Sequence, residues 1–299
     1  MLPIKYLLSV LMSASDAFER LIAGRWIAGE GIDDALEVAE ALNQKGITAM
    51  INYLGEDFKD EKKIDDAIGT YLKLMKKAKE KGARISIAVK LTQLGLCISK
   101  ETARKNYSRI VAAARGSGIF VWLDMEEYRY IQDTISIYET EAKRGGAGIC
   151  IQSYPRRSMN DAKRIVKEKG IVRLVKGAYS AGKDIAYPTR AEATDNYGRI
   201  IDYLFKNSRS FMLATHDEKM ISKALTLQKK SKADVSFAML KGIRNRRAIG
   251  LAGEGQKVSV YVPFGSEWLS YTYRRMREFS NMKLVLRSLL EPEEPSNSK

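Results

Sequence analysis

The sequence predicts an α/β fold in which eight parallel strands, each followed by a helix, close into a distorted (βα)8 barrel. Two observations support this prediction. After Gly46, eight apolar strand candidates alternate with charged, helix-patterned stretches, and most of the strands end in polar side chains. Such alternation argues for parallel pairing of the strands. The 299 residues of the chain suit one barrel, which typically takes about 250 residues.

The strand candidates are continuous apolar runs, as expected where both faces of a strand are buried. They are Ile47–Leu54, Ile85–Leu91, Ile119–Leu123, Ala147–Ile151, Ile171–Val175, Ser210–Ala214, Val235–Leu240 and Lys257–Val262. The helix candidates between them are Asp60–Lys81, Lys100–Ala114, Glu126–Ala142, Met159–Lys169, Thr189–Lys206 and Glu218–Lys230. We expect residues 1–45 to form an N-terminal helical segment that packs on a barrel of residues 46–290. The tail 291–299 has two prolines and little to bury, so we expect it to be disordered.

The alternation alone would also fit an open, doubly wound sheet, and the strand ends favour the barrel. Polar side chains follow nearly every run: Asn52, Glu56, Lys90, Thr92, Asp124, Gln152, Arg173, Lys176, Thr215 to Asp217 and Tyr261. A ring of such groups is what the catalytic rim of a barrel requires. Arg173 lies within an apolar run, so its burial is costly unless a negative group faces it. Either Asp124 or a bound anionic cofactor could be that group.

A last helix is predicted directly after the eighth strand. Residues 263–266 break the strand and can cap a helix, on which Trp268, Tyr271, Arg274 and Arg275 share one face. Two guanidiniums beside a phenol make an anion receptor, because the planar fork of arginine matches a carboxylate or a phosphate. The alternative interpretation is a solvated basic helix face, and the position at the end of the last strand favours the site.

The formal net charge of +15 raises a nucleic acid or an anionic membrane as a partner. The basic residues are scattered and mixed with acids, so we interpret them mainly as solvated faces. No nucleic-acid partner is expected, and peripheral contact with a membrane stays open. Cys97 and Cys150 lie far apart and form no metal-binding or redox spacing, which fits a reduced, cytoplasmic setting. No apolar stretch is long enough to span a bilayer.

Two further motifs suggest other sites and are disfavoured. His216 is the only histidine, so a histidine-based metal site is not expected; with Thr215 and Asp217 it could bind a phosphate or a ribose hydroxyl. The segment 177–184 nearly matches a P-loop, but it ends in Asp where Ser or Thr should ligate Mg²⁺. Pro188 also prevents a helix from following at once. A nucleotide triphosphatase is therefore disfavoured.

Nine short motifs, in colinear order, match one family. They are INYLGE (51–56), VKLTQLGL (89–96), WLDMEE (122–127), GICIQSY (148–154), RLVKGAY (173–179), ATHD (214–217), MLKGI (239–243), YVPFG (261–265) and YTYRR (271–275). From about residue 25 to residue 281, the chain resembles the flavin-dependent proline dehydrogenases, in their single-function form and as a domain of the bifunctional proline utilisation flavoenzymes. The resemblance implies a distorted (βα)8 barrel, with FAD across the carboxyl ends of its strands and a final helix over the substrate.

The resemblance also implies an activity and the residues that carry it. The family oxidises L-proline to Δ1-pyrroline-5-carboxylate by hydride transfer to FAD, the first step of proline catabolism, and commonly passes the electrons to a membrane quinone. Such an acceptor would place the chain in the cytoplasm, or at the inner face of the membrane. By motif, the catalytic residues are Asp124 and Arg173, with Arg173 against flavin N5. The cofactor-binding residues are Met125, Gln152, Lys176, Gly177, Ala178, Thr215 and His216. The substrate-binding residues are Lys90, Tyr179, Tyr261, Tyr271, Arg274 and Arg275, and Glu56 matches an acid that can pair with an arginine of the last helix when the site closes.

Three residues depart from the family pattern: Asn52 stands where Asp is usual, and Ser236 and Ala238 stand where Glu and Gln are usual. None of them belongs to the substrate-binding set. The sequence does not identify a base for the substrate amine. Two alternatives stay open: a flavin-dependent oxidase of another cyclic or secondary amine, and a catalytically idle basic binding module. The intact set of Lys90, Asp124 and Arg173 argues against the idle module.

Overall fold

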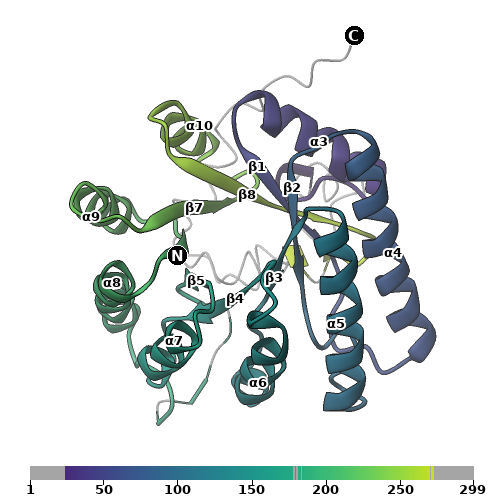
Figure 1. The fold of residues 1–299 in the computed structure, drawn as a ribbon, viewed down its shortest axis with the longest axis horizontal. Helices are drawn as coiled ribbons and strands as arrows, with labels where there is room; N and C mark the ends of the chain where they lie inside the picture. The colour runs from purple at the N-terminus through teal and green to yellow at the C-terminus, as the bar shows by residue number, and fades with distance from the viewer. Residues whose placement is uncertain (1–23, 178, 180, 183, 270, 273–299) are drawn as a thin grey trace, which may run out of the picture.

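The computed structural model describes residues 24–177, 179, 181–182, 184–269 and 271–272, in which a ring of strands is surrounded by helices (Figure 1). The strands are β1 (Thr48–Tyr53), β2 (Ile85–Val89), β3 (Phe120–Leu123), β4 (Ala147–Gln152), β5 (Val172–Val175), β6 (Ser210–Ala214), β7 (Asp234–Leu240) and β8 (Lys257–Phe264). The helices are α3 (Ile32–Gln44), α4 (Glu61–Glu80), α5 (Lys100–Gly116), the 3-10 turn η1 (Tyr128–Tyr130), α6 (Ile131–Ala142), α7 (Ser158–Lys167), α8 (Arg190–Asn207), α9 (Glu218–Gln228) and α10 (Asn245–Gly253).

The eight strands form one closed barrel in chain order, and every neighbouring pair is parallel. The barrel closes where β1 pairs with β8, with Thr48 opposite Ser259 and Tyr53 opposite Phe264. The predicted (βα)8 barrel is therefore confirmed. Residues 1–23 of the expected N-terminal segment lie outside the described residues, as do Ala178, Arg274, Arg275 and the tail 291–299.

Two helices differ from the expectation. A helix was expected from Glu126, but α6 begins at Ile131, after the 3-10 turn. The cause is that the backbone carbonyl of Glu126 accepts a hydrogen bond from Gln152 Nε2 at 2.8 Å, and its side chain accepts from Thr92, which keeps this segment in the rim. Helix α10 was not among the helix candidates. It is only nine residues long, so its apolar periodicity is short.

Side-chain caps fix the points at which several helices leave the rim of the barrel. Asp60, Ser99 and Asp217 each accept a backbone N–H of the first turn of α4, α5 and α9, respectively. Thr189 and Glu192 form a reciprocal capping box at the start of α8. Such caps satisfy backbone donors that a helix start leaves unpaired. The loops between the strand ends and these helices are therefore held at both ends.

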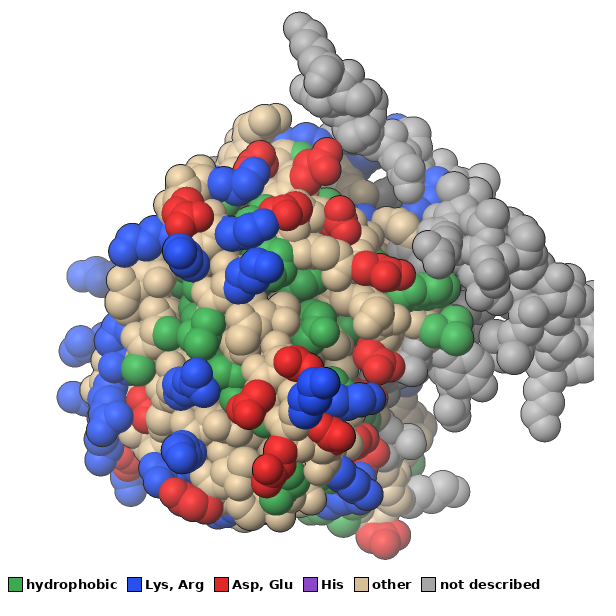
Figure 2. All heavy atoms as spheres, turned by 90° about the vertical axis from the view of Figure 1, so that its right-hand side faces the viewer, with side chains coloured by type: hydrophobic (Ala, Val, Ile, Leu, Met, Phe, Trp, Pro, Cys, Tyr) green, Lys and Arg blue, Asp and Glu red, His purple; other side chains and the backbone are tan. Residues whose placement is uncertain are grey.

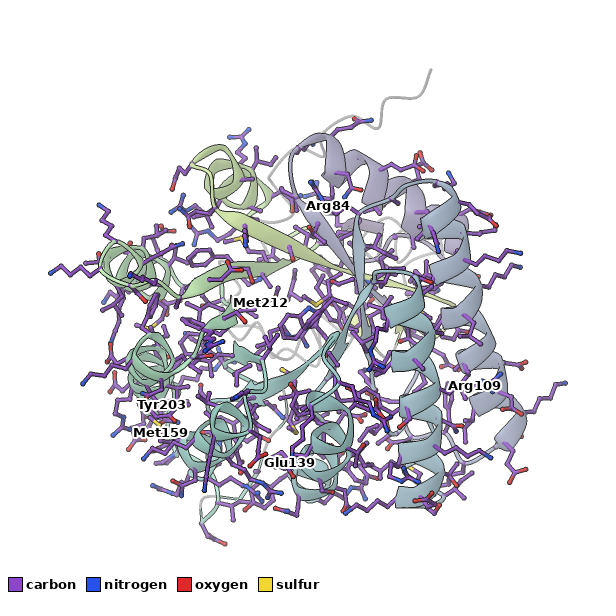
Figure 3. The ribbon with its side chains drawn as sticks, viewed as in Figure 1. Arg84, Arg109, Glu139, Met159, Tyr203 and Met212 are labelled. Atoms are coloured by element: carbon purple, nitrogen blue, oxygen red, sulfur yellow. The ribbon has the colours of Figure 1, made fainter. Side chains whose placement is uncertain are left out.

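Besides two smaller clusters, the core of the described residues has one part between the strands and the helices and another inside the barrel. The interior part contains Met50, Ala88, Trp122, Met212 and Ala238. Figure 3 shows Met212 amid the ring of strands, whereas Arg109 and Glu139 lie out on the helices. Of the three departures from the family pattern, Ala238 thus lies inside the barrel. Ser236 lines a small cavity at the amino ends of the strands, on the side away from the rim.

The third departure, Asn52, belongs to a buried network that fixes the ends of β1 and β2. Asn52 Nδ2 donates to the carbonyl of Ala88 at 2.9 Å, and the hydroxyl of Tyr71, from α4, donates to the same carbonyl at 2.8 Å. The Tyr71 oxygen accepts from the backbone N–H of Tyr53 at 3.2 Å. A carboxylate at position 52 could not donate to Ala88. The amide therefore suits the hydrogen bonding of this chain.

The surface over α4 and α5 carries lysine and arginine interspersed with acidic side chains, as Figure 2 shows. Several of these charges are paired, for instance Lys77 with Asp33 at 2.7 Å and Lys81 with Glu40 at 2.8 Å. This pairing is consistent with solvated helix faces. None of the helices in the described part of the chain is long and apolar enough to cross a bilayer.

Candidate active site at the carboxyl ends of the strands

The centre of the rim is a buried ion pair between Asp124 and Arg173. Arg173 points inward from β5, and Nη2 donates to Oδ1 of Asp124, which directly follows β3. The hydroxyl of Tyr261, from β8, donates to Oδ2 of Asp124 at 2.7 Å. Arg173 is 4% exposed and Asp124 8% exposed. Of the two partners considered for Arg173 from the sequence, Asp124 is therefore the one that this structure shows.

Two aromatic rings hold the Arg173 guanidinium from the sides. Its Cζ atom lies 5.6 Å from the ring centroid of Trp122 and 5.7 Å from that of Tyr261. Guanidiniums at this distance are attracted by the ring faces. Trp122 lies on β3 two residues before Asp124, which continues the line of the strand, so the alternation of side chains turns both of them into the barrel. Nε of Arg173 is buried and has no hydrogen-bond partner among the residues that the structure describes.

Arg173 and Tyr261 keep their protons over the neutral pH range. Burial opposes the charge on Arg173, but Asp124, Cys150 and Tyr261 together raise the pKa of the guanidinium above its usual value. Burial, and then the charge of Asp124, raises the pKa of the Tyr261 phenol well above its usual value. Arg173 is therefore a fixed cation, and Tyr261 keeps its proton as a donor.

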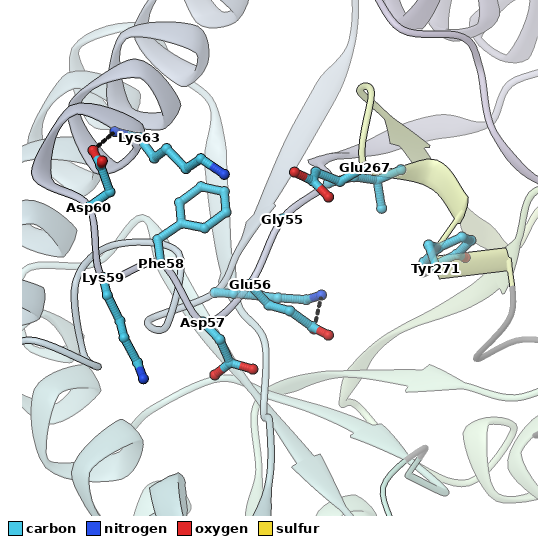
Figure 4. Close-up of a pocket in the computed structure, with 11 residues that line it drawn as sticks. Gly55, Glu56, Asp57, Phe58, Lys59, Asp60, Lys63, Glu267 and Tyr271 are labelled. Atoms are coloured by element: carbon cyan, nitrogen blue, oxygen red, sulfur yellow. Dashed lines mark hydrogen bonds and ion pairs between the residues drawn. The ribbon is translucent and has the colours of Figure 1, made fainter.

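A pocket of about 410 Å³ opens at the rim, between the loop after β1 and the segment after β8. Its lining includes Glu56, Phe58, Lys90, Glu267 and Tyr271, and Figure 4 shows Glu267 and Tyr271 across the opening from Phe58. Nζ of Lys90 donates to Oε2 of Glu56 at 3.1 Å, and Lys90 is only 8% exposed. Pockets of this size bind small molecules. The structure thus gathers three of the residues predicted from the sequence, Glu56, Lys90 and Tyr271, around one small cavity.

The expected cofactor side lies across the rim, at the ends of β4 and β5. Gln152 donates through Nε2 to the backbone of Glu126, whereas its Oε1 is buried and lacks a hydrogen-bond partner within the described ranges. Gly177 has a φ of +104°, and a Cβ there would lie 2.3 Å from Tyr154 Cδ1 and 2.8 Å from Gln152 Oε1. Only glycine adopts this conformation without strain. The backbone of Gly177 can therefore lie close to the side chain of Gln152. Met125 is buried on the neighbouring loop.

A polar corner at the start of α9 holds the remaining members of the cofactor set. Nζ of Lys176 pairs with Oδ2 of Asp217 at 2.9 Å, and Thr215 Oγ1 accepts the Asp217 N–H at 3.1 Å. Burial would raise the pKa of Asp217, but the hydrogen bond from Lys176 and the backbone donors of α9 hold it below its usual value. Nε2 of His216 accepts from the backbone N–H of Leu240 at 3.3 Å. A cation and a hydroxyl beside a helix N-terminus suit a phosphate.

Tyr179 lies partly buried against a small separate cluster of Tyr154, Ala186 and Ala193. The clamp expected at Arg274 and Arg275, and Ala178 of the cofactor set, fall outside the described residues.

Sequence reasoning missed two residues of the site. Trp122, which stacks on Arg173, could have been found from its inward register with Asp124. Glu126 is 3% exposed, and burial raises its pKa to about 7. It was assigned to a helix start, and its partner Thr92 is 34 residues away in the sequence, so no local pattern marks it.

Comparisons with known proteins agree on one family. A family model described as proline dehydrogenase matches residues 35–286. Proline dehydrogenase 1 of Bacillus subtilis (strain 168) is 32% identical over 277 residues, which is 91% of this chain and 92% of that protein. The proline dehydrogenase of Deinococcus radiodurans is 32% identical over 280 residues, 90% of each chain.

Solved structures show the same fold. Proline utilization A from Bdellovibrio bacteriovorus, inactivated by N-propargylglycine, superposes with a TM-score of 0.82 at 22% identity and covers 94% of this chain. Proline utilization A from Corynebacterium freiburgense gives a TM-score of 0.75 at 20% identity, over 92% of this chain. The present chain spans only 35% and 33% of the length of those two chains.

Proposed function

Because the chain belongs to the proline dehydrogenase family and so oxidises proline, the first step of proline catabolism, we propose that it uses FAD held across the barrel rim. The family is consistent with a flavin cofactor. The buried group of Asp124, Arg173 and Tyr261 is the observation that supports this function most strongly, because a fixed cation at the rim suits the negative charge that hydride transfer would develop on the cofactor.

The rim residues fit the flavin. Gln152 Oε1 and Arg173 Nε are buried polar atoms without described partners, and both can hydrogen-bond to a flat polar ring. The bare backbone at Gly177 leaves room for the ring to approach. Met125, Ala178 and His216 complete the proposed cofactor set. Lys176 and Thr215, at the start of α9, would hold the phosphates. FAD, when bound, supplies an acceptor for the hydride.

The pocket residues fit L-proline, with Δ1-pyrroline-5-carboxylate as the product. Lys90 offers a nearly buried ammonium for the substrate carboxylate, and we propose that Arg274 and Arg275 complete the clamp. Tyr261, Tyr271 and Tyr179 supply apolar walls with polar tips for the pyrrolidine ring. Glu56 now holds Lys90 and would exchange this partner for an arginine of the last helix when the site closes.

Arg173 and Asp124 have the catalytic roles in this proposal. Arg173 stabilises the negative charge that develops beside it as the hydride leaves the substrate, and it needs no reorganisation because Asp124 and two rings already fix it. Asp124 keeps Arg173 and the Tyr261 hydroxyl in position.

We also propose that the electrons pass to a membrane quinone and that the chain works at the inner face of the membrane. The family resemblance supports this acceptor. The net charge of +15 favours an anionic surface over a neutral one, and each basic residue that lies at such a surface contributes about 1 kcal/mol.

The cofactor assignment predicts that the purified protein takes up FAD and that Gly177→Ala weakens this uptake. A Cβ at a positive φ costs about 1–2 kcal/mol, and its close contacts with Tyr154 and Gln152 would force the backbone away from the position that the flavin ring is proposed to approach, so Kd for FAD should rise by about tenfold or more. Gly182→Ala is the matched control in the same loop, because its Cβ would meet nothing closer than 3.9 Å. Titration of the apoprotein with FAD measures both values. Equal FAD affinity in Gly177→Ala and wild type, or no uptake by the wild type, would contradict the assignment.

A further inference from the structure

Glu126 is a buried acid at the rim to which the proposed reaction gives no role. It lies two residues after Asp124 and is 3% exposed. Both of its oxygens accept from Thr92: Oε1 from the hydroxyl at 2.5 Å and Oε2 from the backbone N–H at 3.1 Å. A buried carboxyl with two donors from one residue holds that residue firmly. Here that residue belongs to the loop that carries Lys90.

The bonds of Glu126 link the substrate pocket to the cofactor side. The carbonyl of Thr92 accepts from the backbone N–H of Phe58, a residue of the pocket lining, at 3.0 Å. The backbone carbonyl of Glu126 accepts from Gln152 at 2.8 Å. Through Glu126, the loops after β1 and β2 are therefore tied to the end of β4.

The charged and titratable groups that face Glu126 are Lys90 from the end of β2, Glu56 from the loop after β1, and the Cys97 thiol. Burial raises the pKa of Glu126 to about 7, the positive charge of Lys90 works against this rise, and Glu56 adds to it. Lys90 therefore acts on the charge of two carboxyl groups. Glu56 bonds to it directly, and the buried Glu126 titrates near neutral pH.

We propose that Glu126 is a positioning residue for Lys90, and that its charge sets how strongly Lys90 holds a substrate carboxylate. This inference rests on the proposed function, in which Lys90 binds the carboxylate of proline. When Glu126 is ionised, its negative charge weakens the attraction between the Lys90 ammonium and the substrate carboxylate. When it is protonated, its Oε1–H can donate to the Thr92 hydroxyl while Oε2 still accepts the backbone N–H. Titration then changes the charge and leaves the loop in place.

The direction of the pH effect follows. Below about pH 7, Glu126 is neutral and Glu56 is the acid of the described residues that still bonds to Lys90, so a carboxylate ligand binds more tightly. Above this pH, Glu126 is ionised and binding weakens. The change should be on the order of tenfold in Kd, the scale of one unit charge acting through a protein site.

The test is the Kd of cyclopentanecarboxylate for the FAD-loaded protein between pH 5.5 and 8.5, followed through the flavin spectrum. This ligand has the ring and carboxylate of proline but no amine, so its carboxyl is its only titrating group and is mostly ionised over this range, and Kd is referred to the ionised form. Wild type should show a rise in Kd centred near pH 7, and Glu126→Gln should keep the low-pH Kd throughout. Glu127→Gln is the matched control, an exposed acid one residue away, and should behave as wild type.

A second variant tests the assignment without removing the carboxyl. Thr92 donates to Glu126 and so lowers its pKa. In Thr92→Val the inflection of the Kd profile should therefore move to higher pH. Two outcomes would overturn the role of Glu126 and leave the proposed role of Lys90 standing. One is a Kd that depends on Lys90 but does not change with pH, and the other is an inflection that persists in Glu126→Gln. Unchanged binding in Lys90→Met would overturn the proposed role of Lys90 and this inference with it.

Discussion

Arg173→Ala is expected to lower kcat for proline by about 10²–10³-fold, the scale of a lost donor at a site of developing charge. The guanidinium is buried and held by Asp124, Trp122 and Tyr261, so no other described cation can take its place without moving. Because it acts on the developing charge more than on the bound substrate, KM should change much less than kcat. Single-turnover flavin reduction at saturating proline, on the FAD-loaded fraction, measures this effect.

The ion pair calls for a control on stability. Arg173→Ala leaves Asp124 buried without its partner, which typically costs about 3–5 kcal/mol of folding free energy. The double variant Arg173→Ala/Asp124→Ala removes both charges, so it should recover part of the lost thermal stability without recovering the rate. If the single variant reduces flavin as fast as wild type, Arg173 is only a structural partner of Asp124.

Lys90→Met is expected to lower kcat/KM for proline by roughly 30-fold to several-thousand-fold, which corresponds to about 2–5 kcal/mol for breaking a buried charged pair. The reason is that Lys90 is nearly buried and borders the pocket in which the substrate carboxylate would lie. Pyrrolidine, which has no carboxylate, should lose much less. Steady-state kinetics with both substrates measures the difference.

Lys59→Met is the matched control, because Lys59 lines the same pocket but is exposed. Surface substitutions usually change free energies by less than about 0.5 kcal/mol, so this variant should keep its activity on proline. FAD content should be the same in all three proteins. Equal losses on proline and pyrrolidine in Lys90→Met, or no loss on either, would show that Lys90 does not bind the carboxylate.

The sequence was sufficient to predict the barrel and several of the residues that lie at its rim. Strands and helices alternate along the chain, and the carboxyl ends of parallel strands must meet at one end of a barrel. Glu56, Lys90, Asp124 and Gln152 could therefore be assigned to one rim from their positions at or just after strand ends, whereas Arg173 lies within β5 and was marked by its charge in an apolar run. The pairing within that rim could not be decided in the same way. Asp124 was only one of two possible partners for Arg173, because the distance between them depends on strand register and tilt.

Glu126 shows a different limit. Its neighbours in the sequence have a helical pattern, and only the fold brings Thr92 and Gln152 to it. Buried contacts of this kind depend on loop conformations that no periodicity describes. Asn52 is similar, because its hydrogen bonding depends on the fold, which brings it and Tyr71 of α4 to the same acceptor, the carbonyl of Ala88. The clamp at Arg274 and Arg275 stays a prediction from the family motif.

The central claim is that this rim oxidises proline with a bound flavin, and anaerobic mixing of the FAD-loaded protein with L-proline tests it most directly. We expect L-proline to bleach the flavin absorbance fully, and faster than pyrrolidine or other cyclic secondary amines at equal concentration. Cyclopentanecarboxylate should perturb the spectrum without bleaching it, because it has no amine to oxidise. A flavin that stays oxidised with L-proline, while another secondary amine bleaches it, would contradict the account and point to an oxidase of that other amine.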